Sequence, residues 1–186
     1  MPCPRLTEVR AQCFLEELKE IFSVADCITA QTAMAIAHIS QYRVWQYFRI
    51  LAKAGYIEMH KIKRGPIHMY LYCLPGRKPE KIYIHNGRRA YLIRLKDVIK
   101  ALEEVLKSFS TYTAAVRIRR LKDVLNLPNT SAISLILKHM VTSVIKDAII
   151  KEEIRDNSSV YSVVLVVDKE KALKLIEEYK RGSSFS

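Results

Sequence analysis

The chain has 186 residues, of which 49% are hydrophobic, so it can bury one large core or two small ones. This composition excludes disordered and collagen-like proteins, and no apolar run reaches the roughly 18 residues of a membrane-spanning helix. The net charge is +12, and the excess lies in residues 38–120, where eighteen basic side chains accompany five acidic ones. Such a localised excess predicts a polyanionic partner. Because the N-terminal residues lack the apolar region of a secretory signal, we expect a cytoplasmic protein.

Residues 6–22 carry apolar side chains at helical spacing and predict an amphipathic helix. A short second helix is expected to begin at Thr29 or Thr32. Ser40 then has the side chain of a helix N-cap, and a third helix follows with Val44, Phe48 and Leu51 on one side. Gly55 stands where a helix ends in the left-handed conformation.

After Gly55 the apolar period changes from 3.6 to 2, which predicts a hairpin of strands 56–62 and 67–73 joined by a basic turn at 63–66. The order of two helices, a capped helix ending in Leu51-Ala52-Lys53-Ala54-Gly55-Tyr56-Ile57 and a hairpin with a basic tip resembles the winged helix-turn-helix family. The resemblance covers about residues 6–74. It implies a three-helix core with a β-hairpin wing, and binding to DNA.

Two prolines and a glycine in residues 74–80 predict a linker. Asn86-Gly87 is the preferred two-residue hairpin turn and predicts a short hairpin over 82–93. The same order of elements then returns more faintly. We expect helices at 97–110, 119–126 and from 131, a short strand at 113–118, strands at 148–154 and 160–167, and a final helix.

This second region departs from the family pattern, because no glycine ends its third helix and its hairpin tip carries little net charge. The expected fold class is nevertheless α+β, with tandem winged-helix domains. The expected divisions are an N-terminal winged helix-turn-helix domain at 1–76, a basic linker with a short hairpin at 77–94, and a C-terminal winged-helix-like domain with a terminal helix at 95–186.

The resemblance implies that helix 40–54 lies in the major groove and that the wing 61–66 follows the backbone or the minor groove. Gln pairs with adenine and Arg with guanine in two-point fashion, and Tyr can reach a phosphate or a thymine methyl. Large aromatic residues on this helix, Trp45 and Tyr47, are expected to pack in the core or between domains rather than to contact bases. The residues expected to contact DNA are Gln41, Tyr42, Arg43, Gln46, Arg49, Lys61, Lys63, Arg64, Arg88 and Arg89.

The four cysteines match no zinc or iron–sulfur spacing, so we expect no metal. A structural disulfide is also unexpected, because a cytoplasmic compartment is reducing. No catalytic or phosphate-cradling motif occurs, so we expect neither an enzyme nor a cofactor.

These patterns predict a double-stranded DNA-binding protein, either a transcription regulator or a replication initiator of the archaeal tandem winged-helix kind, associated with the nucleoid. The bias toward Ile, Lys and Arg suits a thermophile. A homodimer is expected through the apolar stripe from Phe14 to Phe22 and another on the last helix. The alternative is a tandem winged-helix scaffold that binds protein partners, as in chromosome-condensation or RNA polymerase-associated factors. The small, nearly uncharged residues expected to be exposed in the second region favour a partner there; they are Asn129, Thr130, Ser131, Ser134 and Lys138.

Overall fold

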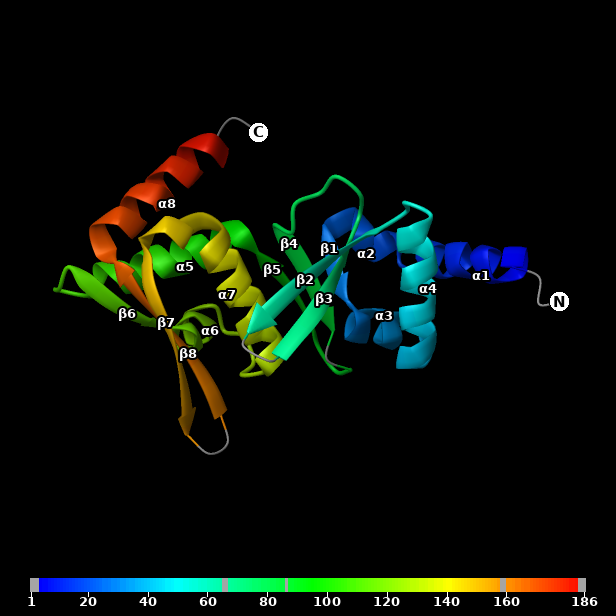
Figure 1. Ribbon diagram of the computed structural model, residues 1–186, viewed down its shortest axis with the longest axis horizontal. Coiled ribbons are helices and arrows are strands. Elements are labelled where there is room, and N and C mark those ends of the chain that lie inside the picture. Colours follow the sequence, from blue (N-terminus) through cyan, green and yellow to red (C-terminus); the bar gives the residue numbers. More distant parts are fainter. Residues whose placement is uncertain (1–3, 65–66, 86, 158–159, 184–186) are drawn as a thin grey trace. The chain divides into compact units, whose positions relative to one another are not determined.

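The computed structural model describes residues 4–64, 67–85, 87–157 and 160–183. The fold is α+β, and the chain divides into two compact units, residues 1–94 and 95–186 (Figure 1). The elements of the first unit are α1 (Pro4–Glu17), α2 (Lys19–Val24), β1 (Cys27–Thr29), α3 (Ala30–Ala37), α4 (Gln41–Lys53), β2 (Glu58–Arg64), β3 (Ile67–Cys73), β4 (Lys81–His85) and β5 (Ala90–Arg94). The elements of the second unit are α5 (Leu95–Lys107), β6 (Thr113–Arg117), α6 (Ile118–Val124), α7 (Ser131–Ile145), a 3₁₀ turn η1 (Lys146–Ala148), β7 (Ile149–Asn157), β8 (Val160–Asp168) and α8 (Lys169–Ser183).

The apolar stripe of residues 6–22 forms two helices, α1 and α2, instead of the single helix predicted. The chain breaks at Leu18, whose N–H donates to the Leu15 carbonyl at 3.1 Å. Phe14, Leu18 and Phe22 are all buried on the two sides of this break. The stripe that we expected to form a dimer contact is therefore used inside the first unit.

Helix α4 begins and ends at the predicted signals. The Ser40 hydroxyl accepts from the Arg43 N–H at 3.4 Å, which satisfies one of the free donors of the first turn. At the other end Gly55 has φ +81°. Its N–H donates to the Ala52 carbonyl at 3.1 Å, and the next N–H, of Tyr56, reaches Leu51 at 2.9 Å. This pair of bonds is a Schellman motif, which a left-handed residue makes possible.

Five strands form the sheet of the first unit in the order β2-β3-β1-β4-β5. β1 is antiparallel to β3 and parallel to β4. The β4–β5 hairpin, which we expected to bridge the two lobes at 77–94, thus belongs to this sheet. The predicted two-residue turn is also wrong, because His85 pairs with Ala90 and four residues separate the strands. Of these four, Asn86 lies outside the described residues.

Cys27 and Cys73 form a disulfide, which corrects our expectation that none would occur. The two cysteines are 46 residues apart in the chain, yet they are direct partners in the register of β1 and β3, with Cα atoms 4.1 Å apart. This proximity depends on strand pairing that the cysteine spacing does not reveal. Cys13 is free and exposed on α1.

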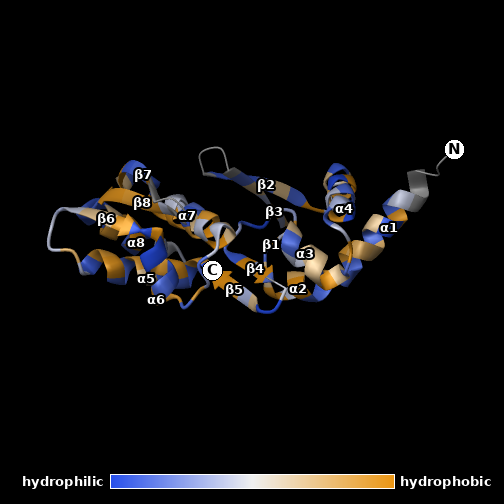
Figure 2. Ribbon diagram, turned by 90° about the horizontal axis from the view of Figure 1, so that it is seen from below, coloured by the Kyte–Doolittle hydropathy of each residue, from blue (hydrophilic) through white to orange (hydrophobic). Residues whose placement is uncertain are grey.

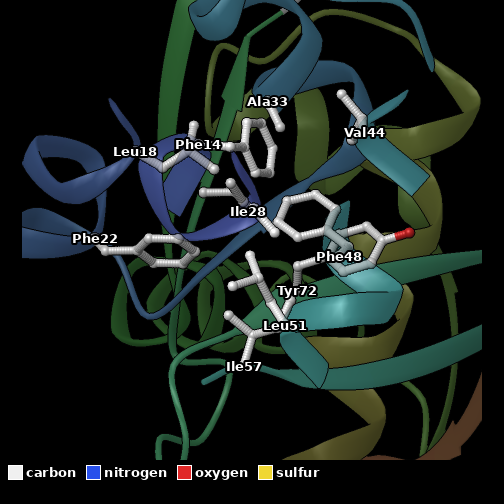
Figure 3. Packing of buried hydrophobic residues seen from close by; sticks show 11 residues of the cluster. Phe14, Leu18, Phe22, Ile28, Ala33, Val44, Phe48, Leu51, Ile57 and Tyr72 are labelled. Atoms are coloured by element: carbon white, nitrogen blue, oxygen red, sulfur yellow. The ribbon is translucent and has the colours of Figure 1, made fainter. Parts of the chain in front are cut away.

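The core of the first unit joins its helices to its sheet (Figure 3). Phe48 of α4 stacks on Tyr72 of β3 with ring centroids 3.8 Å apart. Phe14 of α1 meets the edge of Phe48 at 5.2 Å. Full burial of such side chains stabilises a fold by about 1.5–3 kcal/mol each. The contact between Phe48 and Tyr72 fixes α4 against the β2–β3 hairpin, which matters for the surface described below.

The second unit repeats the order of the first, with a helix, a strand, two helices and two strands. Its sheet has the order β6-β8-β7. The first strand of the unit, β6, is again antiparallel to the third strand, β8. The central strand β8 is strongly hydrophobic (Figure 2), and Val163, Val164 and Leu165 are buried. Thr130 caps α7 by accepting from the Ile133 N–H. None of the described helices has the length and apolar character needed to cross a membrane.

Candidate nucleic-acid interface

Helix α4 has one buried side and one polar side. Val44, Phe48 and Leu51 are buried. Because each residue turns the helix by 100°, positions 42, 46, 49 and 53 follow one another along the middle of the opposite side. The exposed residues of α4 are Gln41, Tyr42, Arg43, Trp45, Gln46, Arg49 and Lys53. All five residues predicted on this helix are thus exposed on it.

Two aromatic residues of α4 have different surroundings. Tyr47 is half-buried, and its ring centroid lies 5.3 Å from that of Phe14, so the prediction that it packs is confirmed. Trp45 does not pack in the core, because its side chain is 47% exposed. The helical turn of 100° per residue carries Trp45 away from Val44 and beyond the edge of the core.

The β2–β3 hairpin presents basic side chains on the side of the sheet that faces α4. Lys61 is the cross-strand partner of Tyr70, and Lys63 is the partner of His68. Alternation along β3 puts His68 and Tyr70 on the same face as Tyr72, which stacks on Phe48. Both lysines are exposed, and the Lys61 ammonium lies 5.8 Å from the Tyr70 ring centroid. Helix and hairpin therefore contribute to one surface.

We call this surface the α4–hairpin surface and define it as the exposed residues of α4 together with Lys61 and Lys63. Arg64 ends β2 as the partner of Ile67. Nothing is described of its side chain, and the turn residues 65–66 lie outside the described residues.

Acidic side chains are nearly absent from this part of the chain. Between Asp26 and Asp97 there are thirteen basic residues and only two acidic ones, Glu58 and Glu80. Glu58 is already engaged, since it accepts from the Gly76 N–H at 3.2 Å and lies 3.4 Å from the His60 ring nitrogen. This part of the chain therefore carries a large excess of positive charge.

Several cations of the surface have no acidic partner among the residues that the structure describes; they are Arg43, Arg49, Lys53 and Lys63. Lys53 was not among the predicted contacts. Its position four residues after Arg49, on the same side of the helix, is the signal that could have identified it. An unpaired arginine or lysine cluster of this kind suits phosphate oxygens.

The β4–β5 loop carries Arg88 and Arg89 at the same end of the sheet as the tip of the β2–β3 hairpin. This follows because β4 runs parallel to β1 whereas β3 runs antiparallel to it. With strands about 4.8 Å apart, the centres of the two hairpins are about 14 Å apart across the sheet. Both arginines are exposed. Thr32 of α3 secures the end of β4, since its hydroxyl donates to the Tyr83 carbonyl and accepts from the His85 N–H.

The corresponding helix of the second unit, α7, differs in charge and exposure. Ser134 is buried, contrary to our expectation, and its hydroxyl donates to the Thr130 carbonyl at 3.2 Å. Lys138 is mostly covered and pairs with Glu152 of β7 at 2.5 Å, so it is not an exposed cation either. Lys122 of α6 is buried and donates to Asn129 Oδ1 at 2.7 Å, which ties α6 to the turn before α7.

One acidic side chain of the second unit is hydrogen-bonded to two lysines. Glu103 of α5 accepts from Lys107, on the same helix, and from Lys180 of α8. These two hydrogen bonds lower the pKa of the Glu103 carboxyl. Among the described residues, no group of three or more His, Cys, Asp or Glu side chains is arranged to hold a metal ion.

Comparison with known proteins gives a weak structural similarity and no match in sequence. No family model matches the chain, and no curated protein matches it either. Among solved structures, a hypothetical protein from Pyrobaculum spherical virus is similar, with 13% sequence identity and a TM-score of 0.47. The match covers 86% of this chain and 97% of the viral one.

Proposed function

We propose that the protein binds double-stranded DNA through the α4–hairpin surface and that each unit is a winged-helix domain. The observation that carries the proposal is the set of exposed cations without acidic partners, which α4 and the β2–β3 hairpin present on one side of the sheet. Phosphates dominate the affinity of proteins for DNA, so such a surface has the charge that binding requires.

The order of elements supports the fold part of the proposal. In each unit two helices follow a short strand and precede a hairpin, and the short strand is antiparallel to the second strand of that hairpin. The capped start of α4 at Ser40 and its end at Gly55 match the signals that the resemblance rests on.

In this proposal α4, within the predicted range 40–54, enters the major groove, and the hairpin at 61–66 follows the backbone or the minor groove. Gln41 and Gln46 offer amides that can pair with adenine, and Arg43 and Arg49 offer guanidinium groups for guanine or phosphate. Arg88 and Arg89 of the β4–β5 loop extend the contact to further phosphates. A transcription regulator or a replication initiator would use such a surface, and we propose this class of function.

A second function, binding to a protein partner, is favoured by a different observation. Ile150 and Ile154 of β7 are 59% and 44% exposed, and β7 is an edge strand of its sheet. An edge strand has free backbone groups that a partner strand can pair with. We propose that the second unit serves such a partner or a second copy of the chain, and a homodimer in light scattering would support the latter.

Titration of a fluorescent random-sequence duplex at increasing salt concentration tests the proposed DNA binding. Six phosphate contacts would give a slope of about −5 for the logarithm of the binding constant against the logarithm of the salt concentration, because bound counterions are released. A protein that does not bind, or whose binding is indifferent to salt, would contradict the proposal and leave the partner-binding function.

A further inference from the structure

We infer that α4 recognises A·T base pairs in the major groove, with Trp45 and Tyr42 in contact with thymine methyl groups. The inference rests on the proposed function, because it names the sequence class of the duplex that the same surface would bind. It also gives a role to Trp45, which the sequence had assigned to packing.

The two aromatic side chains are exposed on the first turns of the helix. Tyr42 is 68% exposed and Trp45 is 47% exposed. Neither ring makes a hydrogen bond or a ring contact with another residue that the structure describes. In contrast, Phe48 and Tyr47 of the same helix pack in or against the core. Two large apolar surfaces three residues apart are thus left in water at the position where a helix in the major groove meets base edges.

The neighbouring side chains match one kind of base pair. Thymine differs from the other bases in the major groove by its C5-methyl group, which apolar side chains contact, whereas adenine offers the N6 and N7 atoms that glutamine pairs with. Gln41 is one helical turn from Trp45, and Gln46 is one turn from Tyr42. Each aromatic ring is therefore next to an amide, as a reader of adenine and thymine requires.

The absence of acidic side chains from α4 also favours A·T over G·C base pairs. Cytosine is read through its N4 amino group by Asp or Glu, and α4 contains neither residue. Arg43 and Arg49 remain available for phosphates or an occasional guanine. The cations of α4 and of the β2–β3 hairpin lie on one side of the sheet, where both sets can contact phosphates.

The test uses the native protein and three labelled DNAs of one mixed A·T sequence: the duplex, the same duplex with every thymine replaced by uracil, and one single strand. Trp45 is the only tryptophan of the chain, so its fluorescence reports on this position directly. We expect the thymine duplex to shift the tryptophan emission. The uracil duplex should bind about fourfold more weakly for each methyl group contacted, the factor that one buried methyl-sized group is worth.

Variants test whether Trp45 causes the difference between the thymine and uracil duplexes. The W45A protein should lose the part of the thymine–uracil difference that Trp45 contributes, and the W45F protein should lose less of it. The double variant Y42A/W45A should bind the two duplexes almost equally. The matched control is Y112A, which removes an aromatic side chain that is 84% exposed in the second unit. This variant should distinguish the two duplexes as the native protein does. Thermal melting confirms that each variant is folded.

The outcomes separate the two proposals. Equal binding of the thymine and uracil duplexes by the native protein would overturn the inference, while the proposed DNA binding would stand. Absence of binding to either duplex would overturn both. Tighter binding to the single strand, with a tryptophan shift, would also overturn the inference, because it would mean that the rings stack on unpaired bases.

Discussion

Lys63 offers the simplest test of the hairpin at the scale of a residue. It is exposed, lies across from His68, and has no ion pair among the described residues. Replacing it with Ala removes one phosphate contact, so the salt slope should become shallower by about 1 without a change of sequence preference. The control is Lys174→Ala, an exposed lysine on α8 that should leave the slope unchanged. A slope that is the same in native protein and Lys63→Ala would exclude the hairpin from the contact.

The ionisation of Tyr72 makes the stability of the core depend on pH. Burial, with a smaller contribution from Tyr70, raises the pKa of Tyr72 from 10.0 to about 12. Below pH 10 the phenol is neutral in both states, and its contribution to stability is complete. Between pH 10 and about 12 the unfolded chain ionises first, so the free energy of unfolding falls as pH rises.

The native protein should therefore lose about 1–3 kcal/mol more stability across this range than Tyr72→Phe, which keeps the ring on Phe48. Denaturant unfolding at pH 9 and pH 11.5 measures the difference. Equal losses in the two proteins would show that this phenol is not buried as described.

Residues on α4 illustrate what the sequence can predict at this scale. The periodicity of Val44, Phe48 and Leu51 was enough to assign the exposed side to Gln46 and its neighbours, because a regular helix fixes both sides at once. Trp45 could not be assigned in this way. It lies at the edge of the apolar stripe, where the outcome depends on how far the neighbouring elements extend over it.

At the scale of elements, the end of α4 depends on Gly55. Its φ of +81° disfavours a side chain, whereas no atom lies within 4 Å of an added Cβ. Gly55→Ala should therefore lower the free energy of unfolding by about 1 kcal/mol through backbone strain alone. Gly182 of α8 is a matched control, since it also has open space but no positive φ. Gly182→Ala should not destabilise the protein, and a similar loss in both variants would argue against the strain.

The sequence predicted most elements because their signals are local. Ser40, Gly55 and Thr130 act on the backbone next to them, and the α4 and α7 boundaries follow. The β4–β5 hairpin was recognised as a hairpin but assigned to a linker. Its place depends on the parallel pairing of β1 with β4, which joins residues more than fifty positions apart and leaves no periodic signal. The break at Leu18 was missed because the apolar stripe continues across it.

At the scale of the whole molecule, the disulfide holds the first unit together around its candidate surface. Cys27 and Cys73 enclose α3, α4 and the β2–β3 hairpin in one closed loop. Closing a loop of this length stabilises a fold by about 2–4 kcal/mol, because it restricts the unfolded chain. The double variant Cys27→Ala/Cys73→Ala should lose stability of this size in denaturant unfolding. Cys13→Ala should not, and equal stability of the double variant and the native protein would contradict the account.

The two units also differ in charge, which bears on where DNA would bind. The first has fifteen basic and seven acidic residues, and the second has sixteen and twelve. Lys138, Lys151 and Lys180 of the second unit are paired with glutamates. The positive charge available to a polyanion is thus concentrated in the first unit, and we expect DNA to bind there.

The most direct measurement is the change in amide and indole NMR signals of the full chain when a short duplex is added. We expect the largest shifts on α4, the indole of Trp45, β2–β3 and Arg88–Arg89, and only small shifts on α7 and β7–β8. Saturating binding with shifts confined to the second unit, or no shifts at all, would contradict the proposed DNA binding by the first unit.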